Sequence, residues 1–439
     1  MKKRYLAIVL AIMMVMLTVL AGCGNSAQGG GSSAATPPAD SGSAPAAAPT
    51  ATGGPNALGD GSTDLENVAF FDPDFDYTSN GPYKLKYLIS SVGPLYDDVD
   101  KAIQHWAPLF NFQYDGMFAS NEDNDLYLNQ LQTCIDQGYD ALIIDPDTTI
   151  YPAILEILNA HPEVQWMADL APPRDESSAE AYLEHPYVGH EHYEVGKAMG
   201  DKLIEYKEEN WPEVPWEEVG VLTVTYSIVP PLDARPRGVK DQFIAKFPEY
   251  ADNVFTVDCT SGGMDPDTAR NLVQPLVSTN SQYTHWLIGA AMDDFAIGAS
   301  SAIDSLGLTD VTCIDTMGGS GLIRIFDSGL DDSWRYANYT AQTVYVEPIM
   351  GALYAFISGY ATLDTLWPNW INKSDHGSEG HMYASYQLPQ VWLDKDNYKA
   401  YLAWSDVYAQ SNYFPEYPKD GITRDSFSTR QPKPAYYDE

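Results

Sequence analysis

The chain has 439 residues, of which 61 are Asp or Glu and 24 are Lys or Arg, so its formal net charge is −37 at pH 7. A charge of this sign repels nucleic-acid backbones and anionic lipid headgroups, so nucleic acid is not an expected partner. The length leaves room for two ordinary domains with sizeable cores once the first 65 residues or so are set aside.

The N-terminal segment MKKRYLAIVLAIMMVMLTVLAGCGN has a basic start, an apolar run and then small residues, the pattern of a secretory signal. Its end, LAGC, resembles the bacterial lipoprotein signal. The resemblance implies that residues 1–22 are removed and that Cys23 carries a lipid; an ordinary cleaved signal that ends near a cysteine is the alternative. Residues 23–65 are rich in Gly, Ser, Ala and Pro and are expected to be a disordered tether. We therefore expect an extracytoplasmic protein anchored to the cell membrane through this lipid.

Three further cysteines, Cys134, Cys259 and Cys313, each lie in an apolar stretch and lack metal-ligand spacing. They are predicted to be small buried hydrophobic residues, not disulfides or nucleophiles. The segment before the first strand, DPDFDYTSNGPY at 72–83, has acids at calcium-loop offsets but lacks the glycine and glutamate of such a loop. It is therefore predicted to be a solvated lead-in.

From Tyr83 onward, short apolar strands alternate with segments of helical periodicity. The strand at 139–146 has the apolar core ALII followed by Asp145, as expected for a strand buried on both faces. Such alternation predicts a parallel sheet wrapped by helices. This first group has strands at 83–90, 111–119, 139–146 and 163–170 and helices at 97–110, 124–138 and 149–162.

The same cycle then restarts, which predicts a second doubly wound unit, followed by a final helix at 347–360. The tail beyond it is rich in Trp and Tyr, and no regular fold is predicted for it. The second group has strands at 187–192, 218–227, 253–259, 284–292 and 310–317 and helices at 193–208, 234–248, 265–280 and 294–307.

Four motifs resemble, in order, those of the type I periplasmic binding proteins, the ribose- and galactose-binding group of ABC-transporter receptors. They are QLQTCIDQGYDALIIDP, YVGHEHYEVGKAMGDKL, ARPRGVKDQF and LIGAAMDDFAIGA. Each motif is weak alone, but their order and spacing match over about Tyr83 to Tyr360.

The resemblance implies an α/β fold of two doubly wound parallel-sheet lobes joined by a hinge, with an aromatic-rich C-terminal extension. The implied boundaries are 83–190 plus 346–365 for the N-terminal lobe, 191–345 for the C-terminal lobe and 366–439 for the extension. In this family a ligand is caught at the carboxyl ends of the strands of both lobes, and closure presents the protein to a membrane partner. The implied function is therefore capture of a sugar-like solute for an ABC permease by a monomer, without enzymatic activity, cofactor or metal.

Several residues match the ligand positions of the family. Asp169 matches the acid at a strand end, with a helix or loop cap as the alternative. Arg235 matches the ligand arginine, with a salt bridge at a helix start as the alternative. Tyr96 and Asp97 lie where the family has a polar and aromatic pair after the first strand.

Three other positions depart from the family. Met292 stands where most members have the asparagine of an Asn-Asp pair, Met317 where they have an aspartate, and Tyr345 where they have a late glutamine. The arginine after the strand-end acid is replaced by Leu170, and Arg174 is a substitute from the loop. These exchanges predict a pocket with one polar end and one softer end, and hence a sugar with an apolar or planar part or a sugar held by stacking.

Other interpretations remain open. The same fold could bind a nucleoside or another planar solute, or act as a sensory receptor for a membrane kinase. A lipid-anchored hydrolase that uses two acids lacks support, because no Ser/His/Asp order or nucleophile elbow is present. The histidines of HPYVGHEHYE and HGSEGH could suggest a metal, but their spacing does not favour one. Of the adjacent acids Asp293 and Asp294, the first is predicted to be a helix N-cap and the second to lie in the first turn.

Overall fold

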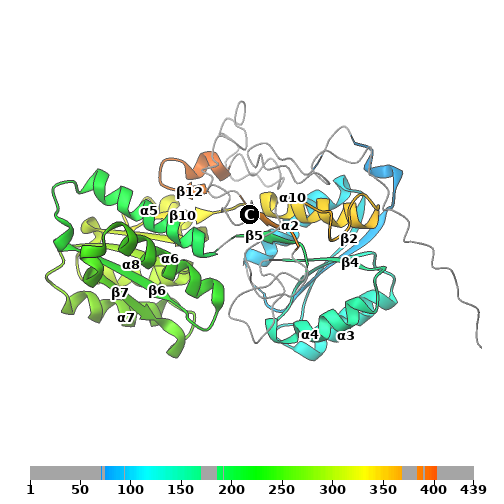
Figure 1. Cartoon of the computed structure of the whole chain (residues 1–439), viewed down its shortest axis with the longest axis horizontal. Helices are drawn as coiled ribbons and strands as arrows, with labels where there is room; N and C mark the ends of the chain where they lie inside the picture. The colour runs from blue at the N-terminus through cyan, green and yellow to red at the C-terminus, as the bar shows by residue number, and fades with distance from the viewer. Residues whose placement is uncertain are drawn as a thin grey trace, which may run out of the picture. The chain divides into compact units, whose positions relative to one another are not determined.

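The computed structural model describes two α/β lobes within the folded part of the chain (Figure 1). It describes residue 71 and residues 75–92, 94–169, 185–190, 192–367, 383–388 and 391–402. The signal, Cys23, the tether, Leu170, Arg174 and the HGSEGH segment lie outside these residues. Among the described residues, no helix is both long enough and apolar enough to cross a membrane.

The first lobe is built on a four-stranded sheet in the order β2-β1-β3-β4, and its strand pairs are parallel. Every residue of β3 is buried, because helices cover both faces of the sheet. α2 and α10 pack on one face around a core that includes Trp106 and Leu353, and α3 and α4 pack on the other around Leu131 and Ile154. The elements are β1 (Tyr83–Ile89), α2 (Pro94–Leu109), β2 (Phe112–Ala119), α3 (Asn124–Asp136), β3 (Ala141–Asp145), α4 (Tyr151–Asn159), β4 (Gln165–Ala168) and α10 (Gln342–Ile357).

The second lobe is built on a six-stranded sheet in the order β12-β10-β9-β8-β6-β7. α5 and α6 pack on one face around Leu203 and Phe243, and α7 and α8 on the other around Val273 and Phe295. All strand pairs are parallel except β10 with β12. The elements are α5 (His192–Asn210), β6 (Val219–Thr225), α6 (Pro230–Lys246), β7 (Val254–Asp258), α7 (Pro266–Thr279), β8 (His285–Ala290), α8 (Asp293–Ser305), β9 (Thr312–Met317), α9 (Ser320–Ser328), β10 (Trp334–Tyr339) and β12 (Val391–Leu393).

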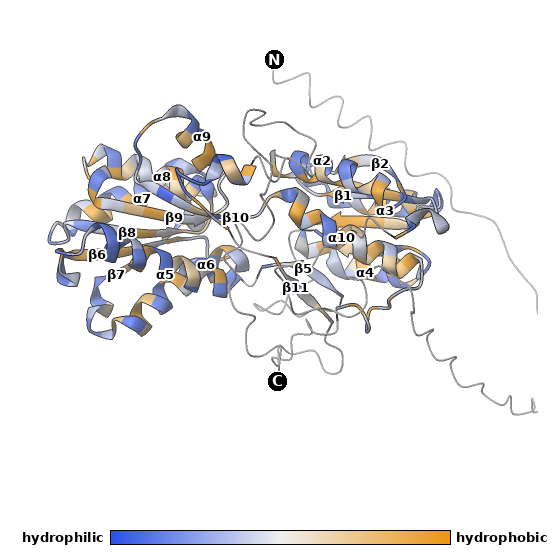
Figure 2. Ribbon diagram, turned by 90° about the horizontal axis from the view of Figure 1, so that it is seen from above, coloured by the Kyte–Doolittle hydropathy of each residue, from blue (hydrophilic) through white to orange (hydrophobic). Residues whose placement is uncertain are grey.

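The hydrophobic pattern of the sequence agrees with this layering. Figure 2 shows hydrophobic residues along α10 and along the central strands of the second sheet. α10 lies in the core of the first lobe although it follows the second lobe in sequence, and it packs against α2, β4 and β5 (Tyr187–Gly189). The predicted α/β class with two parallel-sheet lobes is therefore confirmed, and Cys134, Cys259 and Cys313 are buried as expected.

The tail contains strands that the sequence did not predict. β11 (Ser385–Gln387) pairs in parallel with β5, and β12 pairs antiparallel with β10. Three-residue strands carry too short a pattern to be recognised without their partners. The elements α9 and β10 were also missed between the predicted strand at 310–317 and the final helix.

The lead-in to the first strand is not simply solvated, so that prediction is wrong. Tyr77 opens a short 3-10 helix (Tyr77–Ser79) and is only 4% exposed. Its ring stacks on Phe71 at 5.2 Å between centroids and meets Tyr354 of α10 edge-on at 4.9 Å. The aromatic residues of this segment therefore bury themselves in the first lobe, while Asp76 remains exposed and caps the short helix.

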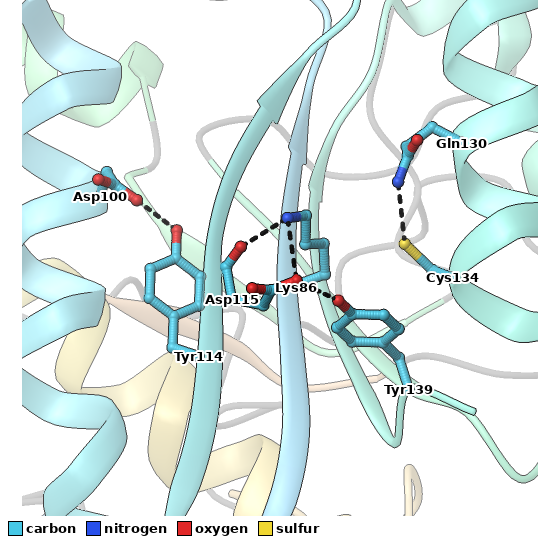
Figure 3. Close-up of polar contacts among 7 residues, drawn as sticks. All are labelled: Lys86, Asp100, Tyr114, Asp115, Gln130, Cys134 and Tyr139. Carbon is cyan, nitrogen blue, oxygen red and sulfur yellow. Dashed lines mark hydrogen bonds and ion pairs between the residues drawn. The ribbon is translucent and has the colours of Figure 1, made fainter. Parts of the chain in front are cut away.

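Polar contacts join the edge strand β2 to neighbouring elements (Figure 3). Lys86 of β1 donates to the Asp115 carbonyl at 2.6 Å, and the Tyr139 hydroxyl donates to the Asp115 carboxylate at 2.6 Å. On the other side of the strand, the Tyr114 hydroxyl bonds to Asp100 of α2. Charged and bonded side chains of this kind discourage pairing of an edge strand with another chain.

Candidate functional site

Two phenols and two carboxyls gather at the carboxyl edge of the first sheet. We call Tyr87, Tyr96, Asp145 and Asp169 the first-lobe acid cluster. Asp145 ends β3 and Asp169 follows β4, and the pairing of Ile144 with Ala168 puts the two acids side by side. The Tyr87 hydroxyl hydrogen-bonds to Asp169, and Tyr96 hydrogen-bonds to Asp145.

Burial and mutual repulsion set the charge state of this cluster. Burial first, and then the negative charge of Asp169, hold the pKa of Asp145 well above its usual range. Burial and the neighbouring carboxylates likewise raise the pKa of Tyr87 and of Tyr96, so both phenols stay protonated. Among the residues that the structure describes, no Lys or Arg contributes to the pKa of Asp145. The cluster therefore offers carboxyl oxygens that can accept hydrogen bonds from hydroxyl groups.

The neighbouring residues of this lobe, including the predicted Asp97 and Tyr345, have different environments. Asp97 is exposed in the first turn of α2 and is not part of the cluster. Tyr345 is 4% exposed in the core of the first lobe, where its ring is close enough to influence the pKa of Tyr87. Trp166 is buried and stacks on His185 at 3.8 Å.

Arg235 of α6 lies at the carboxyl edge of the second sheet. Its Nη1 donates to the carbonyl of Ala291, just past the end of β8, at 2.7 Å, and its Nε donates to Nδ1 of His192 at 3.2 Å. Burial lowers its pKa to about 10, so the guanidinium is still charged at neutral pH. It makes no ion pair with any residue that the structure describes, so the salt-bridge alternative has no partner there.

His190 lies beside this arginine, between β5 and α5. Burial first, and then the charge of Arg235, lower its pKa to about 3, so the ring is neutral. Its Nδ1 atom is buried and has no hydrogen-bond partner among the described residues. The ring centroids of His190 and His192 are 6.4 Å apart. Among those residues, no group of three or more His, Cys, Asp or Glu side chains is placed to hold a metal ion.

The two methionines at this edge are partly buried on different sides. Met292 packs against the core between the sheet and α7 and α8, and Met317 packs against the core beneath α5 and α6. Met292 has extended backbone angles and is itself the N-cap of α8. The prediction that Asp293 is this N-cap is therefore wrong.

Asp293 instead serves another helix. Its Oδ2 accepts a hydrogen bond from the backbone amide of Gly321, in the first turn of α9, at 2.8 Å. Burial raises its pKa to about 6 in spite of these backbone bonds. Asp315, in the middle of β9, is fully buried and accepts a hydrogen bond from Nε1 of Trp392 in β12 at 3.1 Å.

Sequence reasoning named Tyr96, Asp169 and Arg235 as candidates. It did not propose Tyr87 and Asp145, which lie with Tyr96 and Asp169, or His190, which lies beside Arg235. Asp145 carried a usable signal, because a carboxylate that ends an apolar strand must reach the edge of the sheet. Tyr87 carried no such signal, because an aromatic residue within a strand is predicted to be a core residue. His190 lies in a motif that was weighed only as a metal ligand.

Two doubly wound lobes with polar groups at the carboxyl edges of their sheets define a two-lobed solute-binding protein of the type I periplasmic class. Residues 89–334 match the model of the periplasmic binding protein domain, so the chain belongs to this family. Members of the family bind solutes and act outside the cytoplasm. No curated protein sequence matches the chain.

Solved structures with the same fold cover most of the chain. An ABC-transporter periplasmic solute-binding protein from Actinobacillus succinogenes with bound D-allose is 16% identical, with a TM-score of 0.53, over 73% of this chain and 100% of its own. The myo-inositol-binding protein of Caulobacter is 15% identical, with a TM-score of 0.52, over 73% and 96%. A galactofuranose-binding protein is 14% identical, with a TM-score of 0.53, over 75% and 100%. At these identities the similarity shows the fold alone.

Proposed function

We propose that this protein is a lipid-anchored extracytoplasmic receptor that captures a sugar-like ligand by hinge closure and delivers it to an ABC permease. The observation that carries the proposal is the first-lobe acid cluster, in which the carboxyls of Asp145 and Asp169 stand side by side at the carboxyl edge of the sheet. Carboxyl oxygens in a partly dry site bind the paired hydroxyl groups of a sugar well. Arg235 supplies donors at the corresponding edge of the second sheet.

A thermal-shift screen followed by titration calorimetry tests this proposal. Sugars, polyols, nucleosides and aromatic glycosides are the probes, and a ligand at a hundred times its Kd stabilises the fold by about 2.7 kcal/mol. Asp169→Ala is expected to weaken binding at least tenfold, whereas Asp136→Ala, at an exposed position of α3, leaves it unchanged. A screen in which no sugar or polyol stabilises the protein contradicts the proposal.

A nucleoside or another planar solute is the second candidate, favoured by Met292 and Met317 at the edge where relatives carry polar groups. A polarizable, apolar side chain such as that of methionine contacts a planar ring of a ligand better than it contacts a hydroxyl group of a ligand. In the same screen, Met292→Ala weakens a ligand with a planar part and spares a plain sugar. Nanomolar binding of ribose that depends on Asp169 and not on Met292 would exclude a planar solute as the ligand. It would also contradict the predicted apolar end of the pocket.

The anchoring part of the proposal rests on the lipoprotein-like sequence ending in Cys23. Cys23→Ala is expected to move the protein from the membrane fraction to the soluble fraction of cells that express it. Gln28→Ala, in the same tether, is the control and is expected to stay with the membrane. If both variants fractionate alike, the chain is not anchored through this cysteine.

A further inference from the structure

The second lobe holds a charged group whose counterion is not among the described residues. The Arg235 side chain is partly buried, and its guanidinium donates hydrogen bonds to neutral acceptors, the Ala291 carbonyl and the His192 ring. The charge of Asp293 raises the pKa of Arg235, but Asp293 makes no ion pair with it, and its Oδ2 accepts a hydrogen bond from the amide of Gly321. Holding a cation away from water without a counterion costs free energy. We therefore expect the bound ligand to supply the counterion.

A second observation at the same place also points to a ligand. The Nδ1 atom of the neutral His190 ring is buried without a partner among the described residues. A buried polar atom left unpaired costs about 1 to 3 kcal/mol. In the tautomer with a proton on Nδ1, this ring can donate a hydrogen bond to an anion beside Arg235 without carrying a charge of its own.

The acid positions of the family sharpen the argument. The residue at the family's aspartate position is Met317, and Asp315, two residues earlier, is bonded to Trp392 and does not contribute to the pKa of Arg235. The positive charge of Arg235 is therefore left for the ligand to balance. One guanidinium with a neutral histidine matches a single negative charge in a planar group, which is the chemistry of a carboxylate.

We propose that the ligand is a sugar acid, whose carboxylate binds Arg235 and His190 while its hydroxyl groups bind the first-lobe acid cluster. This inference rests on the proposed sugar-binding function and names the chemical class of its ligand. A sugar acid offers hydroxyl donors to the carboxyls of the first-lobe acid cluster and an anion to Arg235.

Calorimetry with matched pairs of ligands tests the inference on the wild-type protein. The probes are D-galacturonate against D-galactose and D-gluconate against D-glucose, with D-glucose 6-phosphate as a dianion. At least one acid is expected to bind ten or more times tighter than its neutral counterpart and tighter than the phosphate. Equal affinity within both pairs, or preference for the phosphate, overturns the inference.

Substitutions then test which side chains produce the preference for the acid over the neutral sugar. Arg235→Gln is expected to abolish the acid preference, so that each acid binds no tighter than its neutral counterpart, and Arg235→Lys is expected to retain part of the preference. Arg237→Gln removes the same charge from the exposed side of the same helix and is expected to change neither affinity. His190→Phe is expected to weaken the acid about tenfold more than the neutral sugar.

The failures of the two proposals are distinguishable. If neutral sugars bind and the acids bind no better, the protein is a sugar receptor and Arg235 binds hydroxyl groups. If neither acids nor neutral sugars stabilise the fold, the sugar-binding function itself is wrong. If Arg235→Gln fails to fold, as judged by circular dichroism, the matched ligand pairs on the wild-type protein still decide the inference.

Discussion

Asp145 shows how burial turns one side chain into a pH-sensitive group. Its pKa is raised, because the folded protein removes water from the carboxyl and places Asp169 beside it. A carboxyl whose pKa is higher in the folded than in the unfolded state binds more protons when folded. Its contribution to the free energy of unfolding is thus fully present below about pH 4, and it is lost as the pH rises through the pKa of Asp145 in the folded state.

The free energy of unfolding is therefore expected to fall for the wild type relative to Asp145→Asn as the pH rises from about 4 to about 8. The slope of the difference is at most about 1.4 kcal/mol per pH unit for one proton. Urea denaturation at several pH values measures it, with Asp136→Asn, at an exposed position, as the control. Parallel pH profiles for wild type and Asp145→Asn would show that this carboxyl is not perturbed.

Asp293 illustrates a cap supplied from outside the helix that it stabilises. Because its carboxylate binds the first-turn amide of α9, Asp293→Ala is expected to destabilise the protein by about 1 kcal/mol. The neighbouring Asp294 forms no such bond, so Asp294→Ala is expected to change stability by less than about 0.5 kcal/mol. Thermal denaturation of both variants measures the difference, and equal effects would argue against this cap.

At the scale of elements, the close crossing of α5 and α6 positions Arg235. A Cβ at Gly196 of α5 would lie 2.0 Å from the Arg235 carbonyl oxygen, and one at Gly238 of α6 would lie 2.3 Å from the Tyr193 carbonyl oxygen. Both contacts are with backbone, which cannot move without shifting the helix. The two glycines therefore set how near α6 comes to α5, and with it the place of the guanidinium.

Gly196→Ala is expected to cost about 1 to 3 kcal/mol of stability by overpacking and to weaken ligand binding by displacing Arg235. Glu208→Ala, at an exposed position of the same helix, is the control. Urea denaturation and calorimetry measure the two effects. Unchanged stability in Gly196→Ala would mean that the helices separate at little cost.

At the scale of the whole molecule, the last described residues complete both lobes. β11 pairs with β5 and β12 pairs with β10, and Trp392 reaches the buried Asp315. The C-terminal extension is therefore part of the fold where it is described. Without it, the edge of β10 would be free to pair with another chain.

A chain that ends at Trp367 is consequently expected to unfold at lower temperature than the full chain and to self-associate. Trp392→Phe removes the hydrogen bond that Nε1 donates to Asp315, and it is expected to lower the free energy of unfolding by about 1 to 3 kcal/mol. Calorimetry and size-exclusion chromatography measure both. A truncated chain with the stability and size of a full-length monomer would show that the extension is dispensable.

Local sequence patterns predicted the α/β class, the two repeated units and the strands β1 to β9, because strands buried on both faces and amphipathic helices have periodicities that are visible locally. A family resemblance named Asp169 and Arg235 as candidate ligand residues. Three relations become visible only once the chain is folded: Asp145 lies beside Asp169, His190 lies beside Arg235, and α10 and β11 pack with elements far away in the chain. These relations join residues that no local pattern connects, and the pKa of a group depends on the neighbours and the burial that the folded chain gives it.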